Sequence, residues 1–141
     1  MIVALDSETN PEPALRLAFD EAGLRAARLI VLHAEKMSAS ARDVAAAQFD
    51  LGIVLANWKQ DHPEVGVSTA ILSGDPDAQL VRWSRSAAVL VVGHPHRRGW
   101  GDWTRSVARS VMRQTHCPLI VAPQAKAQGG RHRELAEEAL T

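Results

Sequence analysis

The chain has 141 residues, and its sixteen basic and sixteen acidic side chains cancel, so nothing in its charge favours nucleic acid as the main partner. No apolar stretch approaches the roughly 20 residues of a membrane span, and Asp6 interrupts the first apolar run too early for a signal peptide. The single cysteine, Cys117, excludes an internal disulfide and does not support a cysteine-based zinc site, which favours a reducing, cytoplasmic setting.

Short apolar runs alternate with amphipathic segments along the chain. Five runs of strand length, each ended by a polar residue, a glycine or a proline, occupy residues 2–6, 28–34, 67–73, 89–93 and 119–122. Helical periodicity predicts one helix after each of the first four runs. These helices are expected to begin near Pro11, Ser38–Ser40, Pro76 and Ser106.

The second predicted helix has the clearest apolar face. Val44, Ala47, Leu51, Val54 and Trp58 recur on it every three or four residues. Trp58 is most simply the last core residue of this helix, rather than a surface on which a ligand stacks.

The alternation predicts an α/β fold with an open, doubly wound parallel sheet of five strands and helices on both faces. Nearly continuous apolar strands joined by helices require right-handed crossovers. The third run alternates more than the others, which places it near an edge of the sheet. One domain is expected over residues 1–123, followed by a flexible tail over residues 124–141, where glycine and polar residues dominate.

The segment from Gly93 to Ser106 has the pattern of a strand end, a glycine-bearing loop and a helix start. In open α/β sheets, such a loop at the carboxyl end of a strand binds anions or nucleotides. A long surface connection without a ligand is the alternative, and the pattern alone leaves the two evenly balanced.

Several other doubly wound classes lack their sites in this sequence. The turn after the first run, Asp6 to Pro11, contains no glycine, which excludes a dinucleotide fingerprint, and no glycine turn is followed by the lysine of a P-loop. A phospho-receiver domain needs an acidic acceptor after the third strand, where this chain has Ser73 and Gly74.

Four segments, taken together, resemble the universal stress protein family over about residues 2–123. They are Ile2 to Ser7 with its terminal acid, Leu29 to Ala34 with His33, Gly74 to Pro76, and Val91 to Gly93 followed at matching distances by Ser106-Val107 and Cys117 to Val121. Each segment alone is weak evidence for the family. The resemblance depends on the order and spacing of all four.

This resemblance implies the strand order 3-2-1-4-5, with the ends of the first and fourth strands flanking one crevice. In members that bind ATP or AMP, the acid after the first strand and backbone at the end of the second hold the adenosine part. A loop after the fourth strand, Gly-x2-Gly-x9-Gly-Ser/Thr, surrounds the phosphates. The positions implied as nucleotide-binding here are Asp6, Ser7, Ala34, Gly93, His94, His96, Arg97, Gly99, Ser106 and Val107.

The phosphate loop departs from the family pattern. His96 and Arg105 occupy two of its glycine positions, and the interval between them is one residue short. Glycines there let backbone N–H groups approach phosphate without a Cβ in the way. Arg97 could hold an anion by charge-assisted bonds instead. Two tryptophans of the loop, Trp100 and Trp103, have no assigned role.

The altered loop favours a non-enzymatic stress-response module that acts as a dimer, with ATP or AMP binding as the alternative. No set of base, nucleophile and metal ligands can be assembled at the predicted strand ends, although weak ATPase activity is left open. The resemblance implies a homodimer through the last strand, formed by Leu119, Ile120, Val121 and Ala122. The sequence also allows the chain to be one half of a tandem protein.

Overall fold

A computed structural model describes residues 1–6, 10–35, 40–72, 74–93 and 111–123 of the chain. The five strands are β1 (Ile2–Asp6), β2 (Leu29–Ala34), β3 (Val67–Leu72), β4 (Leu90–Val92) and β5 (Leu119–Val121). The helices are α1 (Glu12–Arg25), α2 (Ala41–Asp61) and α3 (Pro76–Ser84), and residues 111–114 are also helical. The predicted tail lies outside the described residues, as does the start of the fourth predicted helix.

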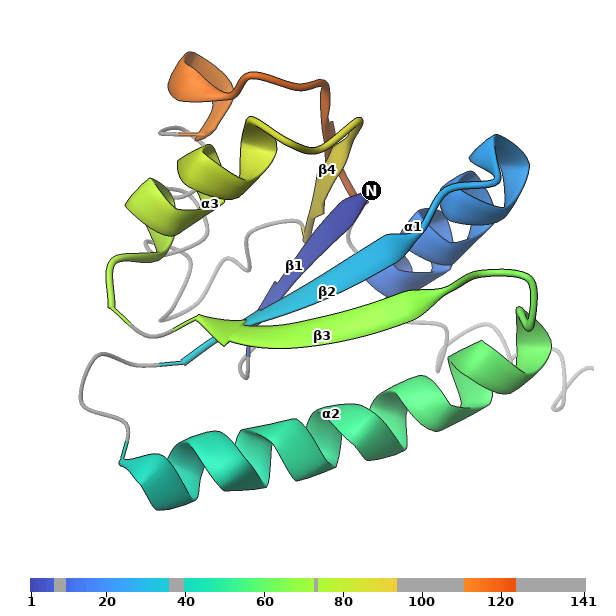
Figure 1. The fold of residues 1–141 in the computed structure, drawn as a ribbon, viewed down its shortest axis with the longest axis vertical. Helices are drawn as coiled ribbons and strands as arrows, with labels where there is room; N and C mark the ends of the chain where they lie inside the picture. Colours follow the sequence, from blue (N-terminus) through green and yellow to red (C-terminus); the bar gives the residue numbers. More distant parts are fainter. Residues whose placement is uncertain (7–9, 36–39, 73, 94–110, 124–141) are drawn as a thin grey trace, which may run out of the picture.

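The strands form one parallel sheet with the order β3-β2-β1-β4-β5, which confirms the predicted fold class and strand order (Figure 1). β3 lies at an edge, as its alternating sequence predicted. The chain winds outward from β1 to β3 and then crosses back to β4. The winding therefore reverses between β1 and β4, at the centre of the sheet.

Each face of the sheet is covered by its own helices. Val3 and Leu5 of β1 pack with Leu15 and Phe19 of α1 and with Leu55 of α2 on one face. On the other face, a second cluster joins the sheet to α3 and to the helical residues 111–114. That cluster contains Ile2, Leu32, Leu72, Leu80, Leu90, Val92, Val111 and Cys117. This division follows from the strand geometry, because successive side chains point to opposite faces.

An aromatic cluster joins α1 to the end of α2. The fully buried Phe19 ring stacks on Trp58, with 5.7 Å between ring centroids, and lies 5.2 Å from the ring of His62. Trp58 therefore contacts the core as predicted. His62 completes the cluster, and its Nε2 atom lies 3.4 Å from a carboxylate oxygen of Asp20 on α1.

Secondary-structure ends are set by recognisable local signals. The Asn10 side chain accepts a hydrogen bond from the backbone N–H of Glu12 at the start of α1. Gly74, with φ of 102°, makes the turn before α3, and Asp75 caps that helix by accepting from the N–H of Asp77.

None of the helices in the described ranges has the length and apolar character needed to cross a bilayer.

Phe19 offers a direct test of this packing. Replacing it with alanine leaves a cavity beneath Trp58 and is expected to lower the free energy of unfolding by about 3–5 kcal/mol. The matched control is Phe49→Ala on the outer side of α2, where the ring is 71% exposed, and this change is expected to cost under about 0.5 kcal/mol. Denaturant unfolding measures both, and equal losses would contradict the assigned core.

Candidate functional site

The carboxyl ends of β1, β2 and β4 meet at one edge of the sheet. Asp6 is aligned with Ala34 of β2, and Ala4 with Val92 of β4. Gly93 follows directly after Val92, so Asp6 and Gly93 end adjacent strands at the same edge. The predicted juxtaposition of these two residues is confirmed.

Only part of the predicted nucleotide site falls within the described residues, namely Asp6, Ala34 and Gly93. The remaining predicted positions lie outside the described residues, and so do Trp100 and Trp103. Those positions are Ser7, His94, His96, Arg97, Gly99, Ser106 and Val107.

Gly93 itself shows no need for glycine in the described structure. Its φ is not positive, and a Cβ placed on it would meet no described heavy atom within 4 Å. A need for positive φ, which often explains a glycine in a loop, therefore does not apply at Gly93.

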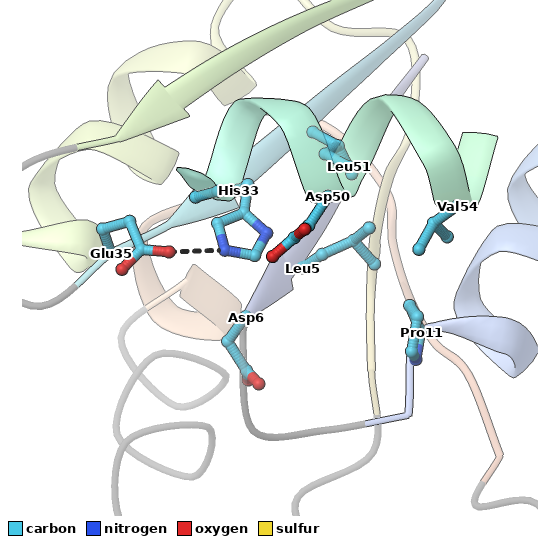
Figure 2. A pocket seen from close by; sticks show the side chains of 9 residues that line it. Leu5, Asp6, Pro11, His33, Glu35, Asp50, Leu51 and Val54 are labelled. Carbon is cyan, nitrogen blue, oxygen red and sulfur yellow. Dashed lines mark hydrogen bonds and ion pairs between the residues drawn. The ribbon is translucent and has the colours of Figure 1, made fainter. Parts of the chain in front are cut away.

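A pocket of about 260 Å³ opens at this edge, on the side of the sheet that α2 covers (Figure 2). The ends of β1 and β2, the start of α1 and the middle of α2 form its walls. It is lined by Leu5, Asp6, Pro11, His33, Glu35, Ala47, Asp50, Leu51 and Val54. Of the predicted site residues that the structure describes, Asp6 lines the pocket, whereas Ala34 and Gly93 do not. The described lining therefore runs from β1 toward β2.

The best-defined polar contact in the pocket joins His33 to Glu35. The Nε2 atom of His33 lies 2.8 Å from a carboxylate oxygen of Glu35, and both side chains are almost buried, with about 12% and 13% exposed. His33 reaches the pocket because it is aligned with Leu5 of β1, whose side chain points to the same face. Glu35 follows directly after β2, and its backbone N–H donates to the carbonyl of Leu72.

Two further carboxylates give the pocket its acidic character. Asp50 lines it from α2, and the carboxylate of Asp6 points away from the His33 ring, toward the end of the sheet (Figure 2). With Glu35, the described lining of the pocket has three carboxylates and one imidazole, whereas Leu5, Leu51 and Val54 supply apolar walls. Such a surface favours a ligand with a flat apolar body and hydrogen-bond donors, and it disfavours an anionic group inside the pocket.

A capping box fixes the start of α2, the helix that carries Asp50. The Ser40 hydroxyl accepts from the backbone N–H of Asp43 at 3.2 Å, and the Asp43 carboxylate accepts from the backbone N–H of Ser40 at 2.7 Å. The Ser40 hydroxyl donates to the same carboxylate, also at 2.7 Å. These hydrogen bonds, chiefly the one from the Ser40 side chain, lower the pKa of Asp43 below its ordinary value.

In the sequence, His33 stood out only as part of the family resemblance, and Glu35 and Asp50 were not predicted as site residues. Glu35 carried a weak signal, because it directly follows an apolar run whose carboxyl end was expected at the site. Asp50 lies beside the apolar face of α2, between Ala47 and Leu51. Val54, predicted for that face, is 39% exposed and contributes to the pocket wall.

Among the described residues, no group of three or more histidine, cysteine, aspartate or glutamate side chains is arranged to hold a metal ion. The described lining of the pocket also contains no serine, cysteine, lysine or arginine. Its chemistry is that of hydrogen-bond acceptors around an apolar cavity.

Comparisons with known proteins agree with this architecture. The model of the universal stress protein family matches residues 1–123. The universal stress protein Rv2005c of Mycobacterium tuberculosis is 34% identical over 134 residues, which cover 89% of this chain and 45% of the relative. The chain thus spans about half the length of this curated relative.

Solved structures of low sequence identity share the fold. A universal stress protein from Archaeoglobus fulgidus, determined in complex with dAMP, has a TM-score of 0.66 at 22% identity and covers 87% of this chain and 98% of its own. A family protein from Arabidopsis thaliana, determined with AMP bound, has a TM-score of 0.54 at 18% identity and covers 89% of this chain and 92% of its own.

The capping box gives a pH-dependent prediction. Because the pKa of Asp43 is lowered in the folded chain, its stabilising effect is complete above the ordinary value of 3.8 and is lost as the pH falls through the lower folded value. Ser40→Ala should bring the pKa of Asp43 back toward 3.8, as measured by NMR titration of its carboxyl carbon. The control Ser68→Ala, on an exposed part of β3, should leave that pKa unchanged, and an unaltered pKa in Ser40→Ala would contradict the assignment.

Proposed function

The chain belongs to the universal stress protein family, and we propose that it acts as a non-enzymatic stress-response module that binds an adenine nucleotide at the carboxyl edge of its sheet. The observation that carries the proposal is the pocket beside Asp6, at the strand ends where open α/β sheets take their ligands. Proteins that share the fold have been crystallised with dAMP and with AMP, which supports this class of ligand.

The pocket suits the base of a nucleotide rather than the whole molecule. Its volume of about 260 Å³ lies just below the range of roughly 300–1,000 Å³ that is usual for complete ligands. The side chains of Leu5, Leu51 and Val54 offer apolar contact to the faces of a flat ring, whereas the carboxylates can accept from its polar edge.

The sugar and the phosphates are proposed to leave the pocket past Asp6. A carboxylate at this position can accept hydrogen bonds from ribose hydroxyls, as acids do at the strand ends of dinucleotide-binding folds. The acidic side chains repel phosphate, which therefore extends toward the end of β4. In the sequence, the segment after Gly93 carries Arg97, Arg98 and Arg105, which can pair with an anion.

The composition of the pocket supports binding without catalysis. His33 and Glu35 resemble a base held by a carboxylate, but the described lining supplies no nucleophile on which such a base could act. Hydrolysis of a bound nucleotide also needs positive charge near the phosphates, and the described part of the pocket has acidic side chains instead. The proposal includes a cytoplasmic setting, which suits the free, buried thiol of Cys117.

The second candidate is a module that binds no nucleotide and works through dimerisation. The altered loop sequence favours it, because His96 and Arg105 stand where the family pattern has glycine. That loop lies outside the described residues, so the sequence-based preference for this candidate stays a prediction.

The edge strand β5 supports a dimer under either candidate. The Pro118 carbonyl and the Ala122 N–H bond to β4, so the backbone groups of Leu119 and Val121 face the free edge of the sheet. An apolar edge strand of this kind can pair through its unpaired backbone groups with the same strand of a second copy. Ala122 is fully buried, and its side chain is therefore not available to a partner.

Nucleotide binding is tested by thermal shift and calorimetry with AMP and Mg-ATP. Ligand at about 100 times its Kd should stabilise the chain by about 2.7 kcal/mol and raise Tm by several degrees. Asp6→Ala should remove most of this shift, whereas Asp61→Ala, at the exposed end of α2, should retain it. A wild-type chain that neither nucleotide stabilises would favour the second candidate.

The dimer is tested by light scattering after size exclusion at micromolar concentration. We expect a dimer for the wild type and a monomer for Val121→Lys, because a charged side chain on the edge strand opposes pairing. Thr69→Lys, on the exposed part of the opposite edge strand β3, should remain dimeric. A monomeric wild type would refute the interface.

A further inference from the structure

We propose that the outer side of α2 is a second self-association surface, on which α2 of a second copy packs in the antiparallel direction. This side is distinct from the core-facing side of the helix, where Leu51 and Leu55 are buried. It is also distinct from the proposed interface at β5, because α2 contacts β3 at the opposite edge of the sheet. The inference goes beyond the proposed function and does not depend on nucleotide binding.

The outer side of α2 is apolar where a solvated helix would be polar. Phe49 and Ile53 are four residues apart and therefore share one side of the helix, and they are 71% and 59% exposed. Ala46 and Ala56 continue this row at helical spacing, and both are exposed. These four residues are called the outer stripe. A surface helix normally carries polar residues opposite its buried face, so an apolar row there indicates a surface that a partner covers.

No described part of the chain covers the outer stripe. Figure 1 shows α2 at one border of the fold, and no other described helix or strand lies beyond it. Gly52 is exposed beside the stripe, and a Cβ placed on it would meet no described heavy atom within 4 Å. Glycine weakens a helix relative to alanine, and packing within the described chain does not require it here. It does allow another helix to approach closely.

The order of residues along the stripe fits a second copy of the same helix. A twofold axis at the level of Leu51 reverses the helix and exchanges positions at equal distances before and after that residue. Phe49 and Ile53 are each two residues from this level, and Ala46 and Ala56 are each five residues from it. Phe49 therefore lies opposite Ile53 of the second copy, and Ala46 lies opposite Ala56, so that the stripe is complementary to itself.

Charges at the two ends of α2 fit the same arrangement. Arg42 is exposed in the first turn and Asp61 is exposed in the last, nine residues before and ten residues after Leu51. The twofold axis therefore brings Arg42 close to Asp61 of the second copy, once at each end of the interface. About 28 Å of helix separates the two residues within one chain, so they can pair only between two copies.

The expected association is weak. Stable interfaces bury roughly 1,200–2,000 Å², and one pair of helices offers less than that. We therefore expect a dissociation constant of about 100 µM or more, which leaves α2 unpaired at micromolar concentration. The monomer expected for Val121→Lys at that concentration is consistent with this value.

Sedimentation equilibrium of the full chain, from micromolar to millimolar concentration, tests the outer stripe. The Val121→Lys background removes pairing through β5, so the association that remains reports on α2. We expect dimers of this variant at millimolar concentration, and adding Phe49→Glu should raise the dissociation constant at least about tenfold, because it places a charge in the apolar contact. The matched control Gln48→Glu, at an exposed position of α2 outside the stripe, should leave the constant unchanged.

A charge reversal in the same background tests the antiparallel arrangement. Arg42→Glu and Asp61→Arg should each weaken association, whereas the two changes together should restore it, because the pair is rebuilt with opposite signs across the axis. Each single change places a favourable charge at its end of the helix, so a loss of association would not reflect a weaker helix.

Three results would overturn the proposal. They are a Val121→Lys chain that stays monomeric at millimolar concentration, an effect of Gln48→Glu equal to that of Phe49→Glu, and a combined charge reversal that associates no better than either single change. The first result would indicate that a different protein covers the stripe. Circular dichroism melting of each variant ensures that these comparisons are made on folded protein.

Discussion

The parallel pairing of β1 with both β2 and β4 is the constraint on which the rest of the structure depends. It places the first strand of the chain at the centre of the sheet, between β2 and β4. The chain leads from β1 to β2 and β3 on one side and then crosses over to β4 and β5 on the other side. The side chains and loops at this point cannot all pack against a helix, so the chain leaves a recess there. Asp6 belongs to that recess because it ends the central strand.

Most of the fold could be predicted from the sequence because the strands are short, apolar and sharply ended. Runs such as 2–6 and 119–122 are too short for core helices, and each is followed by a turn or helix-start signal. The strand order came from the family resemblance rather than from periodicity. Periodicity does not determine which strands pair, and the register of β1 with β2 and β4 confirms the order.

The position of the candidate site in the fold could be predicted from the sequence, but most of the residues that line it could not. Asp6 could be predicted because the end of a central strand is fixed by the topology. Asp50 could not, because it is an exposed residue of a helix, and only the packing of Leu51 and Leu55 on the sheet turns it toward the strand ends. The pairing of His33 with Glu35 depends on the backbone beyond β2, which no pattern in the sequence specifies.

Backbone amide shifts during titration with AMP test the central claim most directly, because they locate the ligand on the sheet without depending on any variant. The account predicts that the largest changes will fall at the carboxyl ends of β1 and β2, around Asp6 and Glu35, and at Asp50 of α2. Changes confined to α3 and the outer edge of β5, or a spectrum that AMP leaves unchanged at millimolar concentration, would contradict it.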